Sequence, residues 1–281
     1  MRYVKTPDET RSIQAVYARG HSIGARSLRV VFETTPEAVA QLLPPPLEPT
    51  PEALGMAVLR DTANSTTVGP FRSTALYLRA GYADASGLYC VSMSVSTPEA
   101  VTFGREIYGE PRKQAKIIFE RQGENVWGSA ERHGFRFFSL RGRLDEAAPT
   151  GRRVESFFSF KFSPRADDGG FESPPRLIEI NEEINVSVSE QGRGEIVFRD
   201  SPHDPVADIP VSQVGGATLT EGDLYTTARV LTEVDPDAFL PYAFAGIDSI
   251  ESVAEGTLLN AQAARKTSQG RGRYRQSTTS I

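Results

Sequence analysis

Short apolar segments follow one another along this chain, separated by turns of glycine, proline and aspartate, with almost no helical run between them. Branched and aromatic residues dominate these segments, as they do in β-strands. A doubly wound parallel sheet needs a helix after each strand, so this succession argues against that class. The predicted strands cover residues 28–33, 55–59, 74–82, 87–95, 116–121, 135–144, 152–162, 176–188, 193–198 and 210–220.

Residues 155–162 show the clearest strand pattern, because their sequence ESFFSFKF alternates with a period close to two. The alternation places Phe157 and Lys161 on one face and the other three phenylalanines on the opposite face. A stripe of aromatic side chains in a strand usually packs in the interior. We therefore expect this segment to lie in the core of a β-barrel or β-sandwich.

One helix is predicted near the start, over residues 37–43, because Thr35 and Pro36 form a typical cap and first turn. A triple proline at residues 44–46 ends it. We divide the chain into an N-terminal arm (residues 1–20), a β domain (residues 21–250) and a C-terminal segment (residues 251–281). The last segment ends in a basic stretch that we expect to be a flexible tail.

Composition excludes several classes of function. A hydrophobic content of 39% excludes disorder along the whole chain, and a net charge of -5 argues against a general nucleic-acid binder. One cysteine, Cys90, excludes a disulfide framework within the chain, and the three histidines show no zinc-binding spacing. The first twenty residues resemble no signal peptide and no apolar run is long enough to cross a membrane, so we expect a cytoplasmic protein without membrane contact.

Residues 103–116 (FGREIYGEPRKQAK) form the segment richest in chemically active side chains. Its glycines and Pro111 predict a sharply shaped backbone. Arg112, Lys113 and Lys116 lie close together, and neighbouring cations lower the pKa of a lysine that is also desolvated. A neutral lysine amine can attack a ketone and form a Schiff base. A solvated polar loop is the alternative interpretation of the same run.

The run G-R-E-x-x-G-x-P, followed by two basic residues, resembles the signature of the acetoacetate decarboxylase superfamily. Residues 31–48, 68–71, 158–188 and 194–198 resemble further segments of that family in order and spacing. The resemblance implies an α+β fold that is mainly antiparallel β, a closed β-barrel or cone with a few peripheral helices. It also implies a homo-oligomer, a small carbonyl or oxo-acid substrate, and no cofactor or metal.

The chain departs from the family pattern at its most reactive position. The resemblance aligns Arg112 with the nucleophilic lysine and Lys113 with the second lysine of the signature. Arginine stays protonated in proteins and cannot form an imine. In the same alignment Ser73 replaces a pocket glutamate, and residues 55–58 hold no acid where the family has a second one. Arg26 lies nearest to the family's N-terminal arginine.

Two assignments of the site follow. In the first, Arg112 anchors a substrate carboxylate through paired hydrogen bonds, and Glu110 and Tyr108 supply acid–base function. In the second, Lys113 is the Schiff-base nucleophile, ranked ahead of Lys116 and Lys161, although one step along an extended segment turns its side chain to the opposite face. We further expect Arg112, Arg26, Ser73 and Lys116 to contact substrate. Arg112 is predicted to lie at a cavity wall together with strands 55–59 and 74–82.

Three functions are consistent with these residues. The first is a lyase of the acetoacetate decarboxylase-like group, of decarboxylase, aldolase or hydratase type, that acts on a small oxo acid or related carbonyl compound. Little acetoacetate decarboxylation is expected from it, because Arg112 replaces the lysine. The second is a true acetoacetate decarboxylase that uses Lys113. The third is a non-catalytic binding protein for a small hydrophobic acid.

Overall fold

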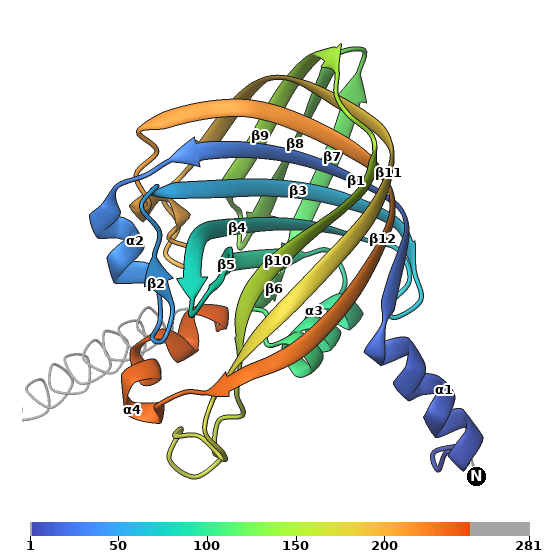
Figure 1. The fold of residues 1–281 in the computed structure, drawn as a ribbon, viewed down its shortest axis with the longest axis vertical. Coiled ribbons are helices and arrows are strands. Elements are labelled where there is room, and N and C mark those ends of the chain that lie inside the picture. Colours follow the sequence, from blue (N-terminus) through green and yellow to red (C-terminus); the bar gives the residue numbers. More distant parts are fainter. Residues whose placement is uncertain (1, 248–281) are drawn as a thin grey trace, which may run out of the picture. The chain divides into compact units, whose positions relative to one another are not determined.

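The computed structural model describes residues 2–247 (Figure 1), so the predicted basic tail lies outside the described residues. A closed barrel dominates this part, with strand order β10, β5, β4, β3, β1, β12, β11 and a final pairing of β11 with β10. Neighbouring strands of the barrel run antiparallel except β5 and β10, which pair in parallel. The barrel strands are β1 (Gly20–Glu33), β3 (Leu54–Ser65), β4 (Phe71–Tyr82), β5 (Ala85–Val95), β10 (Gly151–Lys161), β11 (Arg176–Phe198) and β12 (Gln213–Glu233). The expected closed, mainly antiparallel barrel is confirmed.

The strand β11 is 23 residues long and pairs with two different strands along one of its edges. Its first half pairs with β10 in the barrel, and its second half pairs with β9. The sheet continues from there through β8 and β7, and two short strands pair with the barrel. These remaining strands are β2 (Glu48–Pro49), β6 (Arg112–Gln114), β7 (Lys116–Gln122), β8 (Asn125–Arg132) and β9 (Phe135–Ala147).

The outer part of the sheet, formed by β7, β8 and β9, packs against the outside of β1, β3 and β4, and the middle of β3 is buried on both faces. In β3, Ala57 and Leu59 pack with Phe137 in the outer core, while Met56 and Val58 face the barrel interior. A strand that is buried on both faces reads as a continuous apolar run, as β3 does. The aromatic segment of β10 is core as predicted, with Phe157 facing inward and its neighbours on the outer face.

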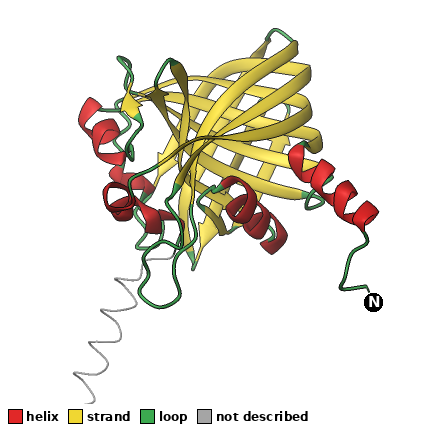
Figure 2. Cartoon of the chain, turned by 60° about the horizontal axis from the view of Figure 1, so that its bottom comes forward, coloured by secondary structure: helices red, strands yellow, loops and turns green. Residues whose placement is uncertain are grey.

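Short helices lie around the barrel (Figure 2). They are α1 (Pro7–Ala18), α2 (Pro36–Leu42), α3 (Pro98–Phe103) and α4 (Pro236–Phe239), with a π-helical turn at Gly104–Tyr108 and 3-10 turns at Val206–Asp208 and Leu240–Gly246. The predicted helix at residues 37–43 corresponds to α2, shifted by one residue. Between residues 2 and 247, no helix has both the length and the apolar character that a membrane crossing requires.

Some strand predictions need correction. The segments 176–188 and 193–198 form one strand, β11, because glycines between them continue the sheet where a second strand approaches closely. Strand β8 was not predicted, since its residues lack a regular alternation, and β12 extends to Glu233 instead of ending near residue 220.

Candidate active site

The segment of residues 103–116 turns sharply at the barrel wall. Helix α3 passes into the π-helical turn, which ends at Gly109 in the left-handed conformation (φ 72°). A side chain at Gly109 would lie 2.6 Å from the backbone of Lys161, so only glycine allows this approach to β10. The Ser159 hydroxyl donates to the Tyr108 carbonyl at 2.5 Å, which fixes the turn against the same strand.

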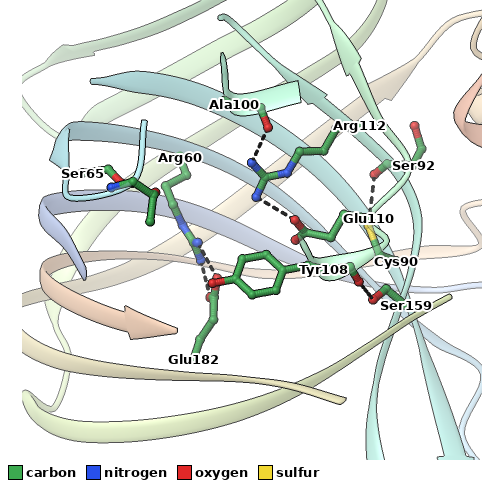
Figure 3. A network of polar contacts seen from close by, with 11 residues as sticks. Arg60, Ser65, Cys90, Ser92, Ala100, Tyr108, Glu110, Arg112, Ser159 and Glu182 are labelled. Carbon is green, nitrogen blue, oxygen red and sulfur yellow. Dashed lines mark hydrogen bonds and ion pairs between the residues drawn. The ribbon is translucent and has the colours of Figure 1, made fainter. Parts of the chain in front are cut away.

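Arg112 begins β6, which pairs in parallel with β5, and its side chain points into the barrel (Figure 3). Its Nη1 donates to the Ala100 carbonyl at 2.8 Å, and its Nη2 lies 2.7 Å from Glu110 Oε2. A Cβ atom at Gly104 would lie 2.0 Å from Arg112 Nε, so this glycine leaves the space that the guanidinium occupies. The sharp glycine-rich backbone therefore presents a buried, paired arginine to the lumen.

Glu110 and Tyr108 lie beside Arg112 with unusual proton affinities. Burial raises the pKa of Glu110, and the opposing attraction of Arg112 does not compensate for it. Burial, together with the charge of Glu110, raises the pKa of Tyr108 to about 12. Near neutral pH the tyrosine therefore remains a hydrogen-bond donor, while burial makes Glu110 take up a proton more readily than an ordinary glutamate does.

A second ion pair crosses the lumen from β3 to β11. Arg60 donates through Nη1 and Nη2 to both carboxylate oxygens of Glu182, each at 2.7 Å, and through Nε to the Ser27 hydroxyl at 2.9 Å. Burial alone would raise the pKa of Glu182, but Arg60 first, then Arg29 and Arg112, lower it below its usual value. Glu182 is therefore held ionised by its forked partner.

Arg29 and Glu155 form a third pair, and Glu155 lies directly across from Glu182 in the register of β10 and β11. The charged side chains of this interior network are Arg29, Arg60, Arg112, Glu110, Glu155 and Glu182. With each glutamate ionised, their formal charges sum to zero. Buried charges are tolerated in proteins when they are paired in this way.

A cavity of about 40 Å³ lies against this network, lined by Arg60, Tyr108, Glu110, Arg112 and Glu182. The hydroxyl groups of Ser65 and Thr67, which lie 2.7 Å apart, form part of its wall together with Phe71 and Phe103. This volume admits a few water molecules and is far below the roughly 300 to 1,000 Å³ of an open ligand pocket. A substrate must therefore displace part of the network or of the wall.

Lys113 lies outside this cavity. Its amine donates to the His203 carbonyl at 2.7 Å and lies 3.4 Å from Asp204, which also accepts from Arg132 at 2.7 Å. The alternation along β6 therefore directs Arg112 inward and Lys113 toward the loop that follows β11. The Lys113 amine therefore lies in a buried cluster different from that of Arg112.

The other predicted contact residues also lie away from the cavity. Lys116 and Lys161 are exposed, and Arg26 pairs with Asp61 on the outer face of the barrel. Ser73 lies opposite Arg60 in the register of β4 and β3 but is not among the residues that line the cavity. The expected walls from strands 55–59 and 74–82 are replaced by Arg60 and Ser65, which follow residue 59 in β3, and by Phe71 at the start of β4.

Arg60 and Glu182 were not among the site residues predicted from the sequence. A signal was present, because Arg60 continues the inward-facing series of Met56 and Val58 along one strand. Glu182 similarly continues the series of Ile178 and Ile180. A charged residue in phase with a buried face needs a partner of opposite charge.

Within residues 2–247, no group of three or more His, Cys, Asp or Glu side chains is arranged to hold a metal ion.

Comparisons with known proteins agree with this fold. A family model described as acetoacetate decarboxylase matches residues 3–234. The acetoacetate decarboxylase of Acidiphilium cryptum is 24% identical over 204 residues, covering 69% of this chain and 81% of that protein. The solved acetoacetate decarboxylase of Legionella pneumophila has a TM-score of 0.70 and 18% identity, over 76% of this chain and 87% of that one. The enduracididine biosynthesis enzyme MppR, complexed with pyruvate, has a TM-score of 0.67 and 17% identity, over 76% and 91%.

Proposed function

We propose, from the premise that this chain belongs to the acetoacetate decarboxylase family, that it is a lyase for a small oxo acid or related carbonyl compound that works without a lysine Schiff base. The observation that carries the proposal is the set of cavity residues. Arg112, Glu110 and Tyr108 line the cavity, whereas no lysine of the described chain does so. The solved complex of MppR with pyruvate supports the choice of oxo acids.

Arg112 is proposed to bind the substrate carboxylate. A guanidinium presents a planar fork that matches a carboxylate in two parallel hydrogen bonds, and these are stronger where water is excluded. Its Nη1 is held by the Ala100 carbonyl. Its Nη2 now pairs with Glu110, and a substrate carboxylate can take the place of Glu110 there.

Glu110 and Tyr108 are proposed to handle the proton and the developing charge. Cleavage or deprotonation next to a carbonyl places negative charge on the carbonyl oxygen. A hydrogen-bond donor near that oxygen lowers the free energy needed to form this charge. Tyr108 keeps its proton over the working range of pH and serves as such a donor. Glu110, whose pKa is raised by burial, suits general acid–base transfer.

The alternative with Lys113 as nucleophile is less consistent with the geometry. Its amine would have to leave the His203 carbonyl and Asp204 and cross to the opposite face of β6. Arg112 offers no such amine.

The proposal is tested by supplying the full chain with a panel of small oxo acids and following each by proton NMR. We expect turnover of at least one member, its loss in Arg112→Gln, and no adduct after borohydride treatment when the intact protein is weighed by mass spectrometry. A borohydride-trapped adduct on Lys113, or acetoacetate turnover of about 10 per second or more, typical of a working enzyme, would contradict it. Binding of an apolar acid without turnover of any oxo acid would favour the binding protein.

A further inference from the structure

We propose that Glu110 is an internal carboxylate that occupies the anion site of Arg112, and that an incoming carboxylate ligand displaces it with the uptake of one proton. The inference deepens the proposed function, on which it rests for the assignment of Arg112 as the carboxylate anchor. It adds a coupling between ligand binding and proton binding, and it makes Glu110 a gate for small monoanionic ligands.

Occupied space is the first argument. The cavity of about 40 Å³ is too small for an oxo acid while the Glu110 carboxylate stays in place. On its other side Arg112 donates to the Ala100 carbonyl, and its guanidinium packs directly against Gly104. Release of the Glu110 carboxylate therefore frees both the room and the hydrogen-bond donor that a ligand carboxylate needs.

Charge balance is the second argument. The interior network holds equal numbers of arginines and glutamates, so it is neutral when all of them are ionised. An additional carboxylate would leave an uncompensated negative charge in a buried space, which is costly. Protonation of one glutamate restores neutrality. A dianionic ligand would need two protons, so the site selects monoanions.

Glu110 is better placed than Glu182 to take this proton, and unlike Glu155 it lines the cavity. Glu182 is held by both nitrogens of the Arg60 fork, whereas Glu110 has one contact, at 2.7 Å, with Arg112. The pKa of Glu110 is raised by burial while that of Glu182 is lowered. The titratable and charged groups that face Glu110 are Arg112 on β6, Arg60 on β3, Glu182 on β11, Tyr77 on β4, Cys90 on β5 and Tyr108 in the π-helical turn.

The exchange balances as follows. Ionised Glu110, one proton and a free carboxylate give neutral Glu110 and a carboxylate bound to Arg112. No covalent bond other than the O–H bond of Glu110 forms, and no electron is transferred. Neutral Glu110 is then an acid placed beside the bound ligand, where it can donate to a carbonyl oxygen.

Calorimetric titration of the full chain with formate, from about pH 5 to about pH 9, tests the coupling. Formate is the smallest carboxylate, and titrations in two buffers of different ionisation enthalpy count the protons taken up. We expect the affinity to fall about tenfold per pH unit where Glu110 is ionised, with uptake that approaches one proton. Glu110→Gln is expected to bind formate with no uptake and at a constant affinity, about tenfold or more tighter than wild type near pH 8.

Glu183→Gln is the matched control, because Glu183 is the neighbour of Glu182 on the outer face, where it pairs with exposed Arg152. It should keep the wild-type pH profile. A wild-type affinity that does not change with pH, no proton uptake, or no formate binding by either wild type or Glu110→Gln would overturn the inference. The wild-type titrations decide it even if Glu110→Gln does not fold.

Formate separates this inference from the proposed function. Proton-coupled formate binding without turnover of any oxo acid would keep the gate and remove the proposed reaction. Oxo-acid turnover that is lost in Arg112→Gln, combined with formate binding that is independent of pH, would keep the reaction and remove the gate.

Discussion

Arg112 and Lys113 are adjacent in the chain, yet their side chains enter different buried environments on opposite faces of β6. Arg112 pairs with Glu110 in the barrel, and Lys113 contacts His203 and Asp204. This separation follows from the alternation of a strand and could be predicted once the segment was treated as extended. Whether Lys113 remained near the lumen depended on the turn before it, which the sequence left open.

The local part of the site was predictable, and the remote part was not. Tyr108, Glu110 and Arg112 lie within one short turn, so any fold of that turn keeps them close. Arg60 and Glu182 lie on strands far apart in the chain and meet only because the barrel closes. Their phase along each strand shows that they face inward, but the register that pairs them is a property of the closed sheet.

Gly104→Ala is expected to displace the Arg112 guanidinium, because the new Cβ would lie 2.0 Å from its Nε. Arg112 is buried and bonded to Ala100, so it cannot move without losing that bond. Overpacking of this kind costs about 1 to 3 kcal/mol, and the displacement should also weaken formate binding. Urea unfolding and calorimetry measure both effects. Gly216→Ala is the control, since its nearest neighbour lies at an ordinary 3.4 Å.

Glu110→Gln is expected to change the pH dependence of stability. The pKa of Glu110 is raised in the folded protein above its usual 4.5, so its ionised form destabilises the fold above the folded pKa. That penalty disappears as the pH falls through the raised pKa. Glutamine imitates the neutral acid, so the variant should be more stable than wild type near pH 8 and equally stable in acid. Equal stabilities by urea unfolding at both pH values would contradict this.

The four α-helices between residues 2 and 247 share one start signal. Thr6, Thr35, Thr97 and Asp235 each cap a helix, and a proline follows each of them. The sequence analysis used this signal once, for α2, although it was present at all four positions. Helix α1 even carries a capping box, in which Thr6 and Glu9 exchange hydrogen bonds. Residues 1–20 were predicted only as an N-terminal arm, with no helix in it.

The division of β11 in the prediction has a physical cause. Gly192 and Gly194 resemble a turn, yet they lie within a continuous strand. A Cβ atom at Gly192 would lie 2.0 Å from the Arg143 carbonyl oxygen, and one at Gly194 would lie 2.6 Å from Val30. These glycines permit close packing where β11 passes from the barrel to the outer sheet. Sequence alone does not distinguish a glycine of a turn from a glycine of close approach.

Asp204→Asn is expected to destabilise the junction between β6, β8 and the loop after β11. Asp204 is 2% exposed and accepts from Arg132 at 2.7 Å, with Lys113 at 3.4 Å. Removal of its charge leaves two buried cations without this carboxylate, and loss of one member of a buried pair costs about 3 to 5 kcal/mol. Urea unfolding measures the loss. Asp168→Asn, in an exposed loop, is the control. A loss no greater than that of the control would show that the cluster is dispensable.

The closure of the barrel could not be derived from the strand pattern. Alternation and apolar runs describe an open sheet and a closed one equally well, and closure was implied by the family resemblance. In the structure it depends on the parallel seam between β5 and β10, where the paired residues are Phe157 with Leu88 and Phe158 with Tyr89. The pairing of β11 with β12, in contrast, runs from Arg176 to Arg193. The seam is therefore the shortest barrel junction in the described part of the chain.

The seam is expected to open before the rest of the barrel. Few backbone hydrogen bonds hold β5 to β10, and parallel pairing is slightly weaker per residue than antiparallel pairing. In native-state hydrogen exchange followed by mass spectrometry, peptides that contain residues 86–90 should exchange faster than peptides from the paired halves of β11 and β12. Equal protection of these peptides would show that the barrel opens as one unit.

Gly87→Ala tests whether this seam also controls the site. A Cβ atom there would lie 2.9 Å from the Ser156 carbonyl oxygen and 2.8 Å from the Phe158 ring, so the strands must separate. Glu155, which precedes Ser156 and pairs with Arg29, should lose its position, and the interior network loses one of its fixed carboxylates. We expect faster exchange at residues 86–90, a loss of about 1 to 3 kcal/mol in urea unfolding, and weaker formate binding. Gly81→Ala is the control, because its nearest atoms lie at 3.8 Å. Faster exchange with unchanged formate binding would show that the seam and the ion-pair network are independent.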